Sequence, residues 1–228
     1  MDIEIKNRDG RVLWHGEAYD MTDAVTRAVH DGADLSGALL ADLDLAGANL
    51  EEGRLAGAQL MRARLRNANF EEADLRGADL TGAHIDGANF EECDLRGANL
   101  DSATFRRSNF EEASLEGVHG VGASFNGCNF EKASLHKADL AGADLSSCNL
   151  EKCDLRAVRM WGANLTGSNL ERCDLRGADF TDADLREANL ERCDVDEAKL
   201  EGAKLEAANL SRLRGRPASG GPRSGPYR

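Results

Sequence analysis

Pairs of adjacent glutamates are the feature of the sequence with the most evident capacity for chemistry. The motif NFEE stands at residues 69–72, 89–92 and 109–112, and variants such as NLEE and NLER continue the same spacing of twenty residues. Regularly spaced carboxylates could belong to a catalytic site, or they could offer negative charge to a basic partner. The choice between these depends on how the chain positions them.

The other reactive residue types give no support to a catalytic site. The five histidines show no metal-ligand spacing, and no pair of residues has the pattern of a nucleophile with its base. The acidic residues alternate with segments that we expect to be solvent-facing turns. We therefore expect a protein that is not an enzyme and that has no cofactor and no metal site.

The elements that position the glutamates follow from an internal repeat of five residues. An apolar centre, usually Leu or Phe, recurs from Leu35 to Leu210 without insertion, which gives 36 pentapeptides over residues 33–212. A small residue, usually Ala, lies two residues before the centre; the pre-centre residue is usually polar, and the two post-centre residues are polar, charged or Gly. The small residue and the centre are two apart, so both point inward as in a strand, and the chain turns after each pentapeptide.

The spacing of twenty fixes the number of corners in each coil. If four pentapeptides form one coil, residues twenty apart stack in a column, and Asn fills one pre-centre column in all nine coils, from Asn49 to Asn209. The sequence thus predicts an all-β solenoid, a right-handed quadrilateral β-helix of about nine coils spaced by ~4.8 Å. We also infer two corner types. Type II turns are expected where Gly recurs at the second post-centre position, and a different corner is expected on the NFEE face, which has no Gly there.

The stacked interior is interpreted as core. Phe70, Phe90, Phe110 and Phe130 should form a ladder of rings, which leucines continue. All six cysteines stand at small-residue positions, and we expect buried free thiols in a reducing compartment. A disulfide between stacked cysteines is the alternative, because their expected spacing lies within the range that such a bond allows.

Both ends of the chain differ from the coil. Residues 1–32 predict a hairpin with its turn at 9–10 and a helix over 22–30 with Thr22 as N-cap, which together form a small α+β cap on the open end of the solenoid. Residues 213–228 are basic and rich in Pro and Gly, and we expect them to form a disordered tail.

Composition limits the partners and the compartment. The chain has 41 acidic and 28 basic residues and a formal net charge of −13, so we expect no direct binding of nucleic acid. Its N-terminus lacks the apolar region of a secretory signal, and no apolar run is long enough to cross a membrane. These observations predict a cytoplasmic protein without membrane contact.

Two surfaces are candidates for contact with a partner. The first is an acidic strip on the NFEE face, which ends where Lys132 replaces Glu at the second post-centre position; the alternative is a solvated surface that keeps the solenoid soluble. The second is a flat face on which Val121, Ala141 and Trp161 share an outward column beside recurring glycines, with Arg159 in a flanking column. The acidic strip consists of Glu51, Glu52, Glu71, Glu72, Glu91, Glu92, Glu111 and Glu112.

The repeat itself resembles a known family. The pattern A(D/N)LxG, with motifs such as ADLRG, GANL and GADL, is similar to that of the pentapeptide repeat proteins and extends over residues 33–212. The resemblance implies a right-handed quadrilateral β-helix, a role other than catalysis and, for one group, an acidic mimic of DNA that binds DNA gyrase or topoisomerase IV and protects against quinolones. Members of that group resemble dimers joined by a C-terminal helix, and several have loops that interrupt the coil. This chain has neither feature within its repeat.

The sequence therefore favours a non-catalytic protein with a rigid surface for protein–protein interaction in a bacterial cytoplasm. The alternative is an acidic DNA mimic whose partner is a type II topoisomerase. Bare strand edges invite pairing, so the C-terminal coil is a candidate contact for a homodimer; the alternative is a monomer in which the tail or the last turn covers that edge.

Overall fold

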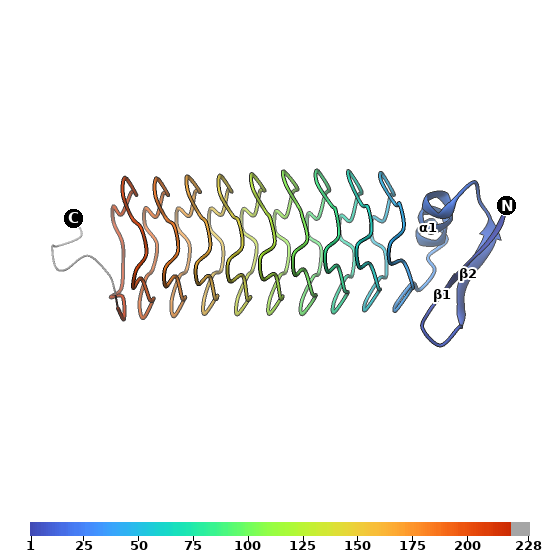
Figure 1. Cartoon of the computed structure of the whole chain (residues 1–228), viewed down its shortest axis with the longest axis horizontal. Helices are drawn as coiled ribbons and strands as arrows, with labels where there is room; N and C mark the ends of the chain where they lie inside the picture. The colour runs from blue at the N-terminus through green and yellow to red at the C-terminus, as the bar shows by residue number, and fades with distance from the viewer. Residues whose placement is uncertain (220–228) are drawn as a thin grey trace.

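A computed structural model describes residues 1–219 and shows a straight column of coils with a small cap at its N-terminal end (Figure 1). The cap consists of strand β1 (Asp2–Lys6), strand β2 (Val12–Glu17) and helix α1 (Met21–His30). The strands form an antiparallel hairpin, and Gly10 takes a left-handed φ of 77° in its turn. The predicted hairpin and helix are thus present, and α1 lies between the hairpin and the first coil.

The first residue of the helix differs from the prediction. Asp20 is the N-cap, and its carboxylate accepts the backbone N–H of Asp23 at 2.9 Å. The hydroxyl of Thr22 instead donates to the carbonyl of Asp44 at 2.9 Å. The prediction of Thr22 as N-cap is therefore wrong, because an Asp two residues earlier satisfies the helix terminus and frees the threonine to tie the cap to the coil.

The coil has the predicted four-sided register. Parallel bridges join pre-centre residues twenty apart along the whole column, for example Asn69 with Asn89 and Asp74 with Asp94. The apolar centres are buried from Leu35 to Leu200, and Phe70, Phe90, Phe110 and Phe130 stack with ring centroids 4.7–4.8 Å apart. The fold is a right-handed quadrilateral β-helix, and the predicted ring ladder is confirmed.

Most pentapeptides with Asp or Asn at the pre-centre position satisfy their backbone in the same way. At the corner that follows Phe70, the N–H of Ala73 donates to the carbonyl of Phe70 at 3.0 Å, and the N–H of Glu72 donates to Glu91 in the next coil at 2.9 Å. The first post-centre N–H has no backbone acceptor, and the pre-centre side chain takes it: Glu71 donates to the Oδ1 of Asn69 at 3.3 Å. This explains why Asp and Asn are so frequent at the pre-centre position.

The corners are uniform, so the prediction of two corner types is wrong. On the NFEE face Glu52, Glu72 and Glu92 have φ of 55–56°, close to the 65° of Gly57 and the 63° of Gly77. A positive φ at the second corner residue, with the bond across the corner described above, is the signature of a type II turn on both faces. The hydrogen-bond ladder holds the L-residues in this conformation, although it costs each of them roughly 1 kcal/mol.

The C-terminal boundary at residue 212 needs correction. Arg214 bridges to Asp194 and Ser219 to Lys199, and Leu213 is buried against the core. The free N–H groups of the preceding coil need carbonyl acceptors, which a backbone of any sequence can supply, so the ladder continues without the pentapeptide pattern. The rest of the predicted tail, 220–228, lies outside the described residues. Within residues 1–219, no helix is long and apolar enough to cross a membrane.

Candidate interaction surfaces

The acidic strip forms one edge of the NFEE face, beside a ladder of asparagine amides. From Asn49 to Asn189 each Asn accepts a hydrogen bond at 2.9–3.3 Å from the Asn in the next coil, and the ladder ends at Asn209. In the strip the same amides also reach glutamates: Asn89 donates to Glu71 at 3.1 Å and Asn109 to Glu91 at 3.2 Å. The ladder therefore holds the strip's carboxylates in register along the column.

The carboxylates of the strip are crowded with like charge. The six glutamates from Glu51 to Glu92 form no ion pair within residues 1–219, whereas Glu112 meets Lys132 at 2.7 Å. Partial burial, followed by the charges of Glu51 and Glu91, raises the pKa of Glu71 above its ordinary value. The strip thus carries uncompensated negative charge up to Lys132, where the predicted change of sign occurs.

Beyond Lys132 the NFEE face becomes a mixed strip in which cations alternate with glutamates. Lys152 lies 3.1 Å from Glu131 and 2.9 Å from Glu151, and Arg192 lies 3.4 Å from Glu171. The backbone and the asparagine ladder continue unchanged through this region. The difference between the strips therefore lies in the side chains at the second post-centre position.

The second predicted surface brings its residues together as expected. Trp161 and Val121 are 58% and 43% exposed, and Ala141 lies half-buried in the coil between them. The neighbouring glycines, Gly122, Gly142 and Gly162, have open space where a side chain would lie, so this face is flat. We call Val121, Ala141, Trp161 and these glycines the flat face. The flanking residue Arg159 pairs with Asp139 one coil away.

The metal-ligating residue types and the cysteines are the other groups with chemical reactivity in the described part of the chain. No group of three or more His, Cys, Asp or Glu within residues 1–219 could hold a metal ion. All six cysteines are buried free thiols, and the Sγ of Cys148 donates to the carbonyl of Phe125 at 2.9 Å. Burial raises the pKa of the Cys148 thiol to about 12, which keeps it protonated and unreactive.

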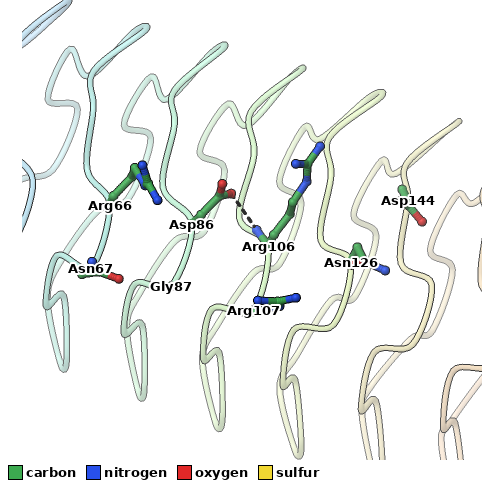
Figure 2. Close-up of a pocket in the computed structure, with 8 residues that line it drawn as sticks. All are labelled: Arg66, Asn67, Asp86, Gly87, Arg106, Arg107, Asn126 and Asp144. Atoms are coloured by element: carbon green, nitrogen blue, oxygen red, sulfur yellow. Dashed lines mark hydrogen bonds between the residues drawn. The ribbon is translucent and has the colours of Figure 1, made fainter.

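Sequence reasoning missed one surface feature, a basic hollow of about 690 Å³ on another face of the column (Figure 2). Figure 2 shows Arg66 on one side, and Arg106 and Arg107 on the other side, of the coil that carries Asp86 and Gly87. The signal was present in the sequence, because Arg66 and Arg106 stand in the only stretches, RLRN and TFRR, that combine an Arg at the first post-centre position with a pre-centre residue other than Asp. The remaining lining residues are Asn67, Asn126 and Asp144.

Comparison with known proteins agrees with this architecture. The family description "Pentapeptide repeats (8 copies)" matches residues 31–67, 58–97, 83–119 and 98–136, and "Pentapeptide repeat region" matches 123–200. Together they extend over most of the coil. The chain belongs to the pentapeptide repeat family, whose proteins are generally structural or interaction proteins.

Several solved structures of pentapeptide repeat proteins are similar to the chain. HetL, involved in the regulation of heterocyst differentiation in the cyanobacterium Nostoc sp. strain PCC 7120, is 31% identical over 84% of this chain and 93% of its own, with a TM-score of 0.35. A trypsin-treated variant of QnrB1, a plasmid-mediated fluoroquinolone resistance protein, is 21% identical over 75% and 89%, with a TM-score of 0.36. A pentapeptide repeat protein of the cyanobacterium Cyanothece 51142 is 22% identical over 76% and 91%, with a TM-score of 0.24. No curated protein matches the chain.

Proposed function

We propose that the chain is a non-catalytic interaction protein of the bacterial cytoplasm, and that its flat face binds a protein partner. The exposure of Trp161 carries this proposal, because a large aromatic side chain that is 58% exposed costs free energy in water unless a partner covers it. Tryptophan is also among the residues that dominate the binding energy of protein interfaces. The glycines beside it let a partner approach the backbone closely.

A photo-crosslinking experiment tests this proposal. A photoreactive residue at position 141, in the middle of the flat face, should capture a defined protein in cells, and Trp161→Ala should abolish the capture. Tyr19→Ala is the matched control, because Tyr19 is an exposed aromatic residue (83%) on the cap, remote from this face. The same captured protein at the same yield in Trp161→Ala would contradict the proposal. Binding through the flat face should also depend weakly on salt.

The acidic strip supports a second candidate function, that of a DNA mimic acting on a type II topoisomerase. Two carboxylates per coil of ~4.8 Å place one negative charge per ~2.4 Å, which approaches the value of ~1.7 Å along duplex DNA. Such a strip would suit a groove that normally holds DNA phosphates. It extends over four coils only, so the mimicry would cover less than one turn of a duplex.

A gyrase supercoiling assay, with and without a quinolone, separates the two functions. A mimic should inhibit supercoiling or protect the enzyme, and Glu72→Lys with Glu92→Lys should remove the effect. Trp161→Ala should leave it unchanged. No effect of the wild-type protein at micromolar concentration would eliminate this candidate.

A homodimer at the C-terminal coil is a further part of the proposal. Within residues 1–219 the backbone N–H groups of Leu205 and Leu210 have no hydrogen-bond acceptor, and both side chains are only half-buried. An edge of this kind is suited to pairing with the same edge of a second copy. Light scattering would test this directly, and a monomeric mass at all concentrations would contradict it.

A further inference from the structure

Arginines at the first post-centre position are normally clamped by the Asp two residues earlier. In the pentapeptide around Leu75, Asp74 accepts two hydrogen bonds from Arg76, from Nε at 2.8 Å and from Nη2 at 2.6 Å. The hydrogen bond from Arg76 lowers the pKa of Asp74, as expected for a stable ion pair. The sequence D-L-R therefore neutralises its own arginine. The same clamp recurs at Asp94–Arg96, Asp154–Arg156, Asp174–Arg176 and Asp184–Arg186.

The hollow is where this rule fails. The pre-centre residue before Arg66 is Arg64, which pairs with Asp44 at 2.9 Å, and the one before Arg106 is Thr104. Within residues 1–219 the side chains of Arg66, Arg106 and Arg107 form no ion pair and no hydrogen bond, although the chain as a whole is strongly acidic. The hydroxyl of Thr104 also lacks a partner among these residues.

Asp86 does not hold the guanidinium group of Arg106, because its carboxylate accepts a backbone N–H instead. Thr104 does not accept the N–H of Arg106 as an Asp would, and the Oδ1 of Asp86 in the preceding coil accepts it instead, at 3.1 Å. The corner residue after Asp86 is Gly87, at which an added Cβ would lie 2.6 Å from the Oδ1 of Asn67. The side chain of Asn67 thus fills the space at this corner, and arginines lie on both sides of the coil that carries Asp86 (Figure 2).

We infer that this hollow binds a phosphate dianion, either free or as a phosphate ester. The hollow is lined by three guanidinium groups and by the carboxylates of Asp86 and Asp144, which leaves one net positive charge and favours an anion. The carboxylate of Asp144, at the far end, is already occupied by the hydroxyl of Ser146 at 2.6 Å and by the amide of Asn164 at 3.0 Å. Guanidinium groups bind phosphate oxygens in pairs, and a tetrahedral anion has enough oxygens for several arginines at once.

Calorimetric titration with inorganic phosphate at constant ionic strength tests this site, at a pH of about 8 where phosphate is a dianion. We expect saturable binding of one phosphate with a Kd on the order of 1 mM. Arg106→Gln should weaken it by about 10-fold or more, since a charge-assisted bidentate contact is lost. Arg186→Gln is the matched control: Arg186 stands in the same column, but Asp184 clamps it, so the affinity should be unchanged.

A second variant rebuilds the clamp and keeps all three arginines. Thr104→Asp creates the D-F-R pattern, so the new carboxylate should hold Arg106 and abolish the binding of phosphate. Ser114→Asp adds the same charge at the same kind of position on another face and should have no effect. Absence of saturable binding to the wild type, or equal weakening by Arg186→Gln and Arg106→Gln, would overturn the inference.

The source of the phosphate is decided by the same titration with phosphoserine. Tighter binding of phosphoserine than of inorganic phosphate would indicate an ester ligand, and the reverse would indicate the free ion. Under either result, Thr104→Asp should abolish the binding of both probes; retention of either one in that variant would overturn the site.

Discussion

The acidic strip and the mixed strip are two regions of one wall, and the charges of their surfaces differ because of the residue at one position. Both have the same backbone ladder, the same column of asparagine amides and a column of buried apolar centres, Phe or Leu. Glu occupies the second post-centre position from Glu52 to Glu112, and Lys or Arg occupies it from Lys132 to Arg212, at nearly constant φ. The shape of the wall and the charge of its surface are therefore specified by different positions.

The glutamates at the first post-centre position report this difference. In the acidic strip Glu71 and Glu91 receive hydrogen bonds from the asparagine ladder, whereas Glu131 and Glu171 in the mixed strip contact Lys152 and Arg192. Exposed like charges ~5 Å apart repel by about 1 kcal/mol in water, and salt reduces this. Like-charge repulsion thus destabilises the acidic strip, although its backbone is the same as that of the mixed strip.

The largest expected effect concerns the core. We expect the buried centres behind the two strips to contribute similarly to stability. Phe110→Ala should lower the free energy of unfolding by ~3–5 kcal/mol, and Leu170→Ala in the mixed region by ~2–5 kcal/mol, because each leaves a cavity among fully buried centres. Chemical denaturation of both variants would measure this. Unchanged stability in Phe110→Ala would refute the four-sided packing of the phenylalanine ladder.

A smaller effect is expected in the asparagine ladder. Both side chains accept the N–H two residues later; beyond that, within residues 1–219, Asn109 bonds to Asn89, Asn129 and Glu91, while Asn169 bonds only to its two neighbouring asparagines. Replacing either with Ala should cost ~1–3 kcal/mol, with the larger loss at Asn109. Equal losses in thermal melts of the two variants would show that the bond to glutamate adds nothing.

Exchanging the charges should move the two strips toward each other. Glu92→Lys places a cation among the carboxylates of the acidic strip and should raise the Tm, by no more than about 2 °C since the site is exposed. Lys152→Glu should lower the Tm by a similar amount, because it removes contacts with Glu131 and Glu151. Both shifts should shrink in high salt; shifts that persist there would have a cause other than charge.

The smallest effect is the pH dependence of the acidic strip. The pKa of Glu71 is raised in the folded state, so its charge destabilises the fold above that pKa, and stability is regained as the pH falls through it. Lowering the pH from about 7 to about 5 should therefore slow the opening of the coils around Glu71. Hydrogen exchange, corrected for its intrinsic pH dependence, would measure this, with the coils of the mixed strip as internal reference.

Most of the architecture could be predicted because the same residue types recur at the same position of every pentapeptide and every coil. The spacing of twenty fixed the register, and with it the ladder from Phe70 to Phe130, the acidic strip and the change of sign at Lys132. The corners were harder: the absence of Gly on the NFEE face suggested another turn, yet the ladder holds Glu72 at φ 56°. The low preference of Glu for a positive φ was outweighed by hydrogen bonds that only the assembled column provides.

The surface features were predictable only in part. The flat face followed from column positions alone, and the structure brings Val121, Ala141 and Trp161 together as expected. The basic hollow did not follow, because it depends on a side-chain contact within each pentapeptide that becomes evident only when Asp74 is seen to hold Arg76. Once that contact is known, the sequence shows that Thr104 stands where the clamped pentapeptides have Asp.

The buried thiols make local opening of the coil measurable at several points along the column. Cys93 lies behind the acidic strip, and Cys173 and Cys193 lie farther along the column; all three are fully covered by the coils around them. A thiol reagent dissolved in water can reach each sulfur only while its own coil is open, so the rate of labelling at each cysteine measures how often that stretch opens. Labelling of the wild-type chain, without any substitution, can therefore compare the opening rate of the coils of the acidic strip with that of the coils of the mixed strip.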